Sequence, residues 1–204
     1  LGKEEKLVID SSPAKDINKE SVYSRMVYIN TKKSGEEFSY YDKLFLMPYG
    51  EYLPYLGGAV ARIAGFSQWV QDFNQVRGFS GGSKVALGEL RGIRVGALFC
   101  SEIISPLLYR ELVGKGAEVL VSASSYATFH GSPLHFRQLF AMAKVRAVEN
   151  NRYFLQASNF APSFMLDNRG RLLKSSVRGQ DMIIYGEVGV ITEKSFYNSL
   201  LDLF

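Results

Sequence analysis

The chain has 204 residues, of which 47% are hydrophobic and 22% are charged, and its net charge is +4. These values are typical of a globular domain with one substantial core, and they exclude a disordered or a fibrous protein. The basic residues are scattered and do not form a stripe interleaved with aromatic residues, so we expect no nucleic-acid partner.

The apolar runs of the chain are short. Two of the longest, residues 95–99 and 119–123, fall far below the roughly 20 residues that a membrane-spanning helix needs. The charged residues 1–6 do not resemble a signal peptide and give no cellular address. Cys100 is the single cysteine, so it forms no internal disulfide and is either a packing residue or a reactive thiol.

Strand-like segments open the chain at residues 6–10, 22–30 and 38–41. They are rich in β-branched and aromatic residues with turn residues between them, which predicts consecutive antiparallel strands. Residues 53–79 then mix apolar and aromatic residues with Gly, Gln and Asn. This composition indicates a partly helical segment that projects from the core.

Strands and helices alternate in the middle of the chain. Residues 85–90 and 93–99 flank Arg91-Gly92, which predicts a hairpin whose second strand leads directly into Cys100. Apolar residues at helical spacing after Pro106, followed by a glycine stop, predict a helix. Further along, the patterns predict a buried strand at 117–123, a helix at 134–150 and a strand at 153–157.

The last part of the chain is predicted to complete a sheet. Residues 163–167 and 172–174 flank the turn sequence Asn168-Arg169-Gly170 and are predicted to pair as a hairpin. Residues 182–191 are predicted to form the closing strand. Mixed strands with covering helices indicate a layered α/β domain, and the sequence has no internal repeat.

An unusual segment follows the third predicted strand. It reads Y-D-K, then L-x-P-Y-G-E-Y-L-P, and it places Lys43 and Glu51 eight positions apart across a proline and a glycine. Neither strand nor helix periodicity explains this spacing. The two residues are either part of a site or a solvated ion pair on a surface turn.

A second unusual segment is Phe99-Cys100-Ser101-Glu102. A cysteine between a strand and a helix lies where backbone N–H groups and the positive end of the helix dipole stabilise a thiolate. Glu102 is placed to orient a neighbouring lysine, to accept a proton or to cap the helix.

These segments, with A-M-A-K-V-R-A-V-E-N-N-R at 141–152 and S-N-F-A-P-S at 158–163, resemble the nitrilase (carbon–nitrogen hydrolase) superfamily. The run L-x-P-Y-G-E-Y-L-P is most similar to the apolipoprotein N-acyltransferases within it, because generic amidases carry the lysine but usually not this continuation. The resemblance extends from about residue 7 to residue 203. It implies a four-layer αββα sandwich.

The resemblance also implies a mechanism. A thiolate attacks a phospholipid ester and forms a thioester, the lysine ammonium and the Ser101 N–H hold the oxyanion, and a lipoprotein amine takes the acyl chain. The implied catalytic residues are Cys100, Lys43, Glu51 and Glu102. The residues expected to contact substrates are Tyr49, Ser101, Trp69 and Tyr126. Neither a cofactor nor a metal is expected, since His130 and His135 have no cysteine or carboxylate near them in the sequence.

The sequence departs from the family pattern in two places. The family's general-base glutamate precedes the segment that matches residues 7–16, whereas here only Glu4 and Glu5 stand there, with no apolar strand before them. A truncated chain, a glutamate from another chain and a non-catalytic relative are the three explanations, and we favour truncation at both ends. In addition, Ser101 replaces a usual aromatic residue and residues 124–129 replace Ser-Asn-Asp-x-Trp-Phe, which points to a different substrate placement and acyl specificity.

Residues 53–79 admit two interpretations. They are either an ordinary insertion that packs its aromatic residues on the core or, as we favour, a membrane-interface arm whose Phe66, Trp69 and Phe73 enter the lipid headgroup region. The glycines at 78, 81 and 82 lack the Lys-Ser ending of a phosphate loop and are interpreted as hinges.

We therefore expect a single domain, residues 1–204, that serves as the extracytoplasmic (periplasmic) part of a bacterial inner-membrane acyltransferase in lipoprotein biosynthesis. Its expected partners are a phospholipid acyl donor, a lipoprotein acceptor and the membrane surface. Two alternatives remain: a soluble nitrilase-type amidase acting on a small amide, which would need no aromatic arm, and a non-catalytic relative that binds lipid or lipoprotein.

Overall fold

The computed structural model describes residues 6–16, 21–32, 35–130 and 132–201. Glu4, Glu5 and residues 202–203, on which some of the expectations above depend, lie outside these ranges. In the described ranges, each helix is too short or too polar to cross a membrane.

The first sheet contains β1 (Lys6–Lys15), β2 (Val22–Lys32) and β3 (Gly35–Asp42). They are antiparallel neighbours in the order β1-β2-β3, which confirms the three predicted strands. Successive side chains point to opposite faces of a strand, so Met26, Tyr28 and Tyr41 are buried on one face while Phe38 and Tyr40 are exposed on the other. The first sheet therefore packs through a single face.

The second sheet has six strands in the order β4-β5-β6-β7-β8-β9. Their bounds are β4 (Leu87–Leu90), β5 (Ile93–Phe99), β6 (Val119–Ser125), β7 (Tyr153–Asn159), β8 (Phe164–Leu166) and β9 (Leu172–Ser175). β5, β6 and β7 are parallel, and the other pairs are antiparallel. The predicted hairpins at Arg91-Gly92 and at 168–170 are confirmed. The carboxyl ends of the three parallel strands meet at one edge, where ligands usually bind in sheets of this type.

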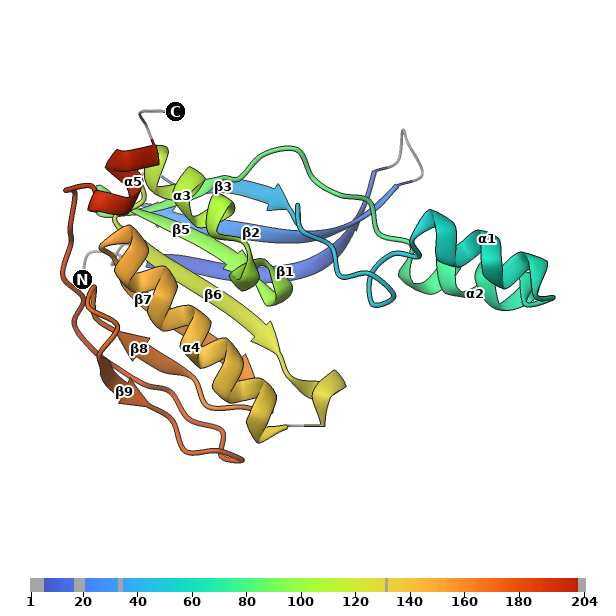
Figure 1. Cartoon of the computed structure of the whole chain (residues 1–204). Helices are drawn as coiled ribbons and strands as arrows, with labels where there is room; N and C mark the ends of the chain where they lie inside the picture. Colours follow the sequence, from blue (N-terminus) through green and yellow to red (C-terminus); the bar gives the residue numbers. More distant parts are fainter. Residues whose placement is uncertain (1–5, 17–20, 33–34, 131, 202–204) are drawn as a thin grey trace.

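Helices α3 (Pro106–Gly114) and α4 (Pro133–Asn150) cover the outer face of the second sheet (Figure 1). The one-turn helices η1 (Cys100–Ile104) and η2 (Ala127–Phe129) connect strands to these helices, and α5 (Phe196–Leu201) follows near the end of the chain. Proline opens both long helices at their first turn, and the Ser132 hydroxyl accepts the His135 N–H at the start of α4. The predicted helices are confirmed.

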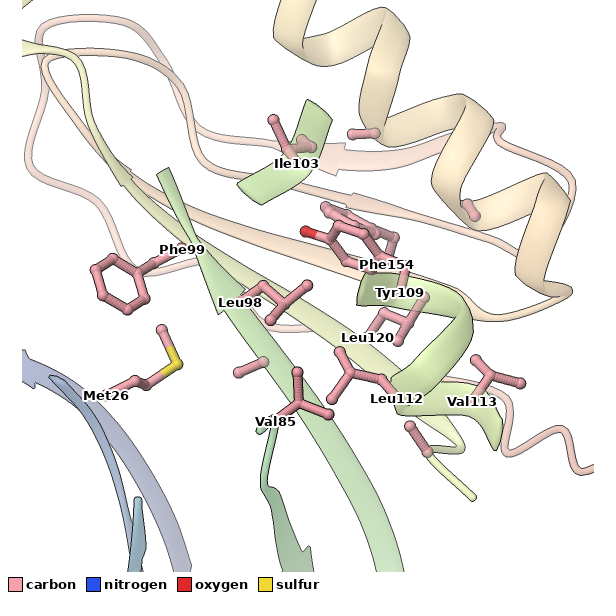
Figure 2. Close-up of a cluster of buried hydrophobic side chains, with 14 of the residues drawn as sticks. Met26, Val85, Leu98, Phe99, Ile103, Tyr109, Leu112, Val113, Leu120 and Phe154 are labelled. Atoms are coloured by element: carbon pink, nitrogen blue, oxygen red, sulfur yellow. The ribbon is translucent and has the colours of Figure 1, made fainter. Parts of the chain in front are cut away.

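Apolar side chains fill both interfaces of the second sheet (Figure 2). Met26 of the first sheet faces Phe99 of β5, while Leu98 points to the opposite face, toward Tyr109 and Leu112 of α3. The Tyr28 hydroxyl accepts the Ala97 N–H at 2.9 Å and so ties the two sheets together. These layers give the mixed α/β architecture expected from the sequence. The other side of the three-stranded sheet carries Val8, Phe38 and Tyr40, which are 49%, 65% and 54% exposed.

The prediction of a closing strand at residues 182–191 is wrong, because this segment forms no strand in the structure. Its two glycines explain why. A Cβ at Gly186 would lie 2.6 Å from Met165 Cε, and one at Gly189 would lie 2.7 Å from the Tyr153 ring. The segment therefore crosses closely over side chains of β8 and β7 and is not paired with the sheet.

The partly helical segment predicted at residues 53–79 contains a pair of helices, α1 (Tyr55–Ile63) and α2 (Ser67–Arg77), joined at Gly65. Gly65 has φ +88°, a conformation that suits glycine. The pair extends away from the sheets and is attached to them at one end (Figure 1). We call residues 53–79 the arm.

Candidate active site

Lys43 and Glu51 form a buried ion pair. The Lys43 side chain is fully buried, and its Nζ lies 2.6 and 2.7 Å from the two carboxylate oxygens of Glu51. A tight turn returns the chain to the lysine: Tyr49 has φ +60°, and the Gly50 and Glu51 N–H groups both donate to the Met47 carbonyl. The interpretation as a solvated surface pair is therefore wrong. We call residues 43–52 the lysine loop.

Cys100 follows β5 directly and is partly buried. Its φ of +56° is in the left-handed region, which is unfavourable for a residue with a Cβ and is found in sharp turns at functional sites. The helix that begins at Cys100 is a single 3₁₀ turn, and α3 begins only at Pro106. The prediction that an α-helix dipole supports the thiolate is therefore wrong, and Cys100 instead lies in a sharp turn.

We call the turn at Cys100 (residues 99–102) the nucleophile turn. Glu102 joins this turn to the lysine loop. Its Oε1 accepts the backbone N–H groups of Leu44 at 2.8 Å and Phe45 at 3.3 Å. Its Oε2 accepts the Phe99 N–H at 3.1 Å and the Tyr41 hydroxyl at 2.7 Å. Burial raises the pKa of Glu102, while these donors favour its ionised form. With both oxygens occupied, Glu102 is suited to hold the loops together and not to carry a proton.

Ser101 makes a second link between the same two segments. Its side chain is buried and its hydroxyl donates to the Phe45 carbonyl at 3.0 Å. The Lys43 ammonium lies 5.2 Å from the centroid of the Phe99 ring, on the residue that precedes the cysteine. The structure thus fastens the loop that carries Lys43 and Glu51 to Ser101 and Glu102 of the nucleophile turn, at the carboxyl end of β5.

Tyr126 borders the same edge from β6. It follows the end of this strand, and its backbone N–H donates to Asn159 at the end of β7. Burial raises the pKa of its phenol to about 12, and the nearby Cys100 acts in the same direction. The Tyr126 hydroxyl therefore stays neutral and can donate a hydrogen bond.

The other two expected substrate contacts lie farther out. Tyr49 is 60% exposed at the turn of the lysine loop, and Trp69 is 48% exposed on α2 of the arm. Trp69 packs against Phe73, with ring centroids 5.6 Å apart. Because α2 extends away from β5 (Figure 1), Trp69 is not brought together with the residues around Cys100.

Tyr41 was not singled out from the sequence. It is fully buried, donates to Glu102 and packs against Phe99, with ring centroids 5.9 Å apart. Burial raises its pKa well above the ordinary value, so it stays a neutral donor. Tyr41 comes two residues before Lys43, and side chains two residues apart in an extended segment lie on the same face. This spacing is the sequence signal that could have identified Tyr41.

Metal ligands do not gather in the described ranges, where no three His, Cys, Asp or Glu side chains form a cluster suited to a metal ion. His135 instead stacks on Phe129, with centroids 3.6 Å apart.

A family model described as carbon-nitrogen hydrolase matches residues 6–193. The chain belongs to the carbon-nitrogen hydrolase family. Among curated relatives, the apolipoprotein N-acyltransferase of Geobacter metallireducens is 30% identical over 190 residues, which cover 88% of this chain and 34% of the relative. That of Aquifex aeolicus is 30% identical over 159 residues, with coverage of 78% and 32%. This carbon-nitrogen hydrolase domain therefore spans about one third of the length of these relatives.

Solved structures of the nitrilase superfamily have the same fold. Saccharomyces cerevisiae Nit3, a member of branch 10 of this superfamily, superposes with a TM-score of 0.62 at 19% identity, over 86% of this chain and 57% of its own. A carbon-nitrogen hydrolase superfamily protein of Xanthomonas campestris gives a TM-score of 0.59 at 14% identity, over 87% and 60%. The expected nitrilase type of α/β fold is confirmed.

Proposed function

We propose that this domain transfers a fatty acyl chain from a phospholipid to the N-terminal amine of a lipoprotein, through a thioester on Cys100. The observation that carries the proposal is the pair of bonds from Leu44 and Phe45 to Glu102, which fasten the lysine loop onto the nucleophile turn. These bonds support a site in which the buried Lys43 ammonium acts together with the Cys100 thiol. The names of the relatives supply the acyl transfer and the apolipoprotein acceptor, whereas the phospholipid donor is what the sequence resemblance implies.

In the first half of the proposed reaction, the Cys100 thiolate attacks the ester carbonyl carbon. A carbon–sulfur bond forms, the carbon–oxygen bond breaks, and the lysophospholipid alkoxide takes up a proton from solvent water as it leaves. Lys43 and the Ser101 N–H stabilise the oxyanion, and the complete burial of Lys43 strengthens this interaction because the local dielectric is low. Glu51 keeps the ammonium oriented and neutralises its charge.

In the second half, the lipoprotein amine attacks the thioester carbonyl. An amide bond forms, the carbon–sulfur bond breaks to release the thiolate, and the amine gives a proton to solvent water, which balances the proton taken up by the alkoxide in the first half. Both carboxylate oxygens of Glu51 face Lys43, and both oxygens of Glu102 accept other donors. We propose that neither of them is the general base, and that Glu51 and Glu102 act by positioning the lysine and the loop.

The arm supports a lipid substrate. Large apolar side chains cover its outside: Tyr55, Leu56, Ile63 and Val76 are 89%, 73%, 88% and 75% exposed, and Phe66 and Trp69 are also exposed. A water-facing helix pair normally buries such residues, and their exposure favours a membrane-interface arm. A small-amide hydrolase has no use for this surface. We accordingly place the domain at the extracytoplasmic face of the bacterial inner membrane.

Intact-protein mass spectrometry after incubation with bacterial phospholipid vesicles tests the proposal. We expect a mass increase of one acyl chain that hydroxylamine removes and that Cys100→Ala abolishes. A non-catalytic lipid-binding relative would bind the vesicles without this adduct, whereas an amidase would hydrolyse a small amide and ignore the vesicles. Absence of the adduct even with the full-length gene product would overturn the proposal.

The role of the arm has its own control. Ile63→Ser combined with Val76→Ser should weaken cosedimentation with vesicles and slow acylation from them. Acylation from a water-soluble ester should be unchanged, because both residues are exposed and lie outside the site. Unchanged vesicle binding in this variant would refute the interfacial role.

A further inference from the structure

A cleft of about 450 Å³ lies beside the proposed site. Its lining residues come from the lysine loop and from the segment that follows α2: Leu44, Phe45, Leu46, Tyr52, Phe79 and Gly81. This volume is within the usual range of ligand pockets, about 300 to 1,000 Å³. No charged side chain lines the cleft.

The walls of the cleft are fastened to the catalytic machinery. Leu44 and Phe45 donate their N–H groups to Glu102, and the Phe45 carbonyl accepts the Ser101 hydroxyl. On the opposite wall, the Phe79 N–H donates to the Glu51 carbonyl at 2.9 Å. The cleft is thus built on the same backbone that carries the ion pair, and one wall contacts the residue next to Cys100.

The chemistry of the lining selects an alkyl chain. Leucine, phenylalanine and tyrosine side chains gain free energy when methylene groups replace water between them, whereas a phosphate or ammonium headgroup would find no counter-charge there. The second large cleft near this edge of the sheet, of about 720 Å³, has a mixed lining that includes the carboxylate of Asp181 and several other polar groups beside Met182 and Ile183. The apolar cleft is therefore the better place for the chain.

The arm begins and ends at the mouth of this cleft. Tyr52 lies just before α1, and Phe79 lies just after α2. An alkyl chain that leaves a lipid layer in contact with the arm would therefore pass these two rings before it reaches the cysteine.

We propose that this cleft holds the hydrocarbon chain of the Cys100 thioester, and that the absence of a side chain at Gly81 sets the chain length accepted. The inference rests on the proposed function. A Cβ built at Gly81 meets only the Leu44 carbonyl, at 3.8 Å, so a larger residue fits the backbone and shortens the cleft.

The test compares acetyl and octanoyl esters of p-nitrophenol as acyl donors, with intact-mass detection of the adduct. The p-nitrophenolate group leaves without needing a proton, and the reaction is run at pH 9, where an ordinary cysteine thiol is largely ionised without a general base. The chain has one cysteine, so a hydroxylamine-sensitive adduct identifies Cys100. Each buried methylene favours binding by about fourfold, so the octanoyl ester should acylate the parent chain faster than the acetyl ester.

Gly81→Leu should lower the octanoyl-to-acetyl rate ratio about tenfold or more, and Gly81→Ala should lower it less. Thermal unfolding followed by circular dichroism should show that both variants are folded. Gly114→Leu is the matched control, because Gly114 is exposed on α3 with nothing within 4 Å of its Cβ position. It should leave the ratio unchanged.

The outcomes separate the two proposals. If both esters acylate Cys100 but the ratio is the same in Gly81→Leu as in the parent, the cleft does not hold the chain and the inference is overturned. If neither ester acylates the parent chain, Cys100 is not the nucleophile and the proposed function fails with it.

Discussion

Neutralising Glu51 gives a quantitative test of the buried ion pair. In Glu51→Gln the Lys43 ammonium, which is fully buried, loses the carboxylate that now lies 2.6 and 2.7 Å away. Breaking a buried pair costs about 3 to 5 kcal/mol. Because the Glu51 side chain is 19% exposed, water reaches the site in part, and we expect about 3 kcal/mol. For a domain of this size that corresponds to a fall in Tm of about 6 to 12 °C.

Thermal unfolding followed by circular dichroism measures this change. The matched control is Glu111→Gln, which breaks the ion pair with Lys115, where the side chains are 2.8 Å apart and 40% and 42% exposed. Exposed pairs contribute at most about 1 kcal/mol, so its Tm should change little. Equal losses in the two variants would show that Lys43 is solvated, which contradicts the burial on which the site depends.

A double variant separates charge from shape. Lys43→Met together with Glu51→Gln removes both charges and leaves no unpaired ammonium, so most of the lost stability should return. A double variant as unstable as Glu51→Gln alone would assign the loss to packing, and the electrostatic reasoning would be wrong.

Three further substitutions have defined outcomes. Tyr41→Phe removes the hydrogen bond to the buried Glu102 carboxylate and should lower the urea-derived free energy of unfolding by about 1.5 to 3 kcal/mol; an unchanged value would contradict the bond. Gly82→Ala puts a Cβ 2.0 Å from the Asp42 carbonyl oxygen and should cost about 3 kcal/mol in the same assay, so a neutral effect would contradict this close approach. Burial lowers the pKa of His135 below its usual value of 6.5. As the pH falls through 6.5, the unfolded chain therefore binds a proton before the folded chain does, and the free energy of unfolding decreases. His135→Gln should reduce this fall, measured as Tm between pH 7 and pH 5, and an identical pH profile would contradict it.

Local patterns were sufficient for most of the fold. Alternating β-branched residues predicted the strands, and Pro106 and the apolar spacing after it predicted α3, because these elements follow the chain's own periodicity. The segment 182–191 has the composition of a strand, but its placement depends on Gly186 and Gly189 passing close to side chains of other strands. No local pattern contains that information.

The site was only partly accessible from sequence. The spacing of Lys43 and Glu51 identified the pair, but its burial depends on the packing of the first sheet against the second. Glu102 joins the nucleophile turn to the lysine loop through partners 57 to 61 residues away. The sequence alone could not show whether Glu102 caps a helix or makes this link. The chemical roles of these residues remain predictions that the substitutions here address.

The rate of Cys100 acylation by a water-soluble ester tests the central claim most directly, namely that the buried Lys43 ammonium stabilises the oxyanion formed at this thiol. The measurement compares the parent chain with the folded Lys43→Met, Glu51→Gln double variant under single-turnover conditions. Removal of an oxyanion-stabilising group lowers such rates by about 10² to 10³, and we predict a fall of this size. A double variant that acylates at the parent rate would show that Lys43 takes no part in the chemistry at Cys100.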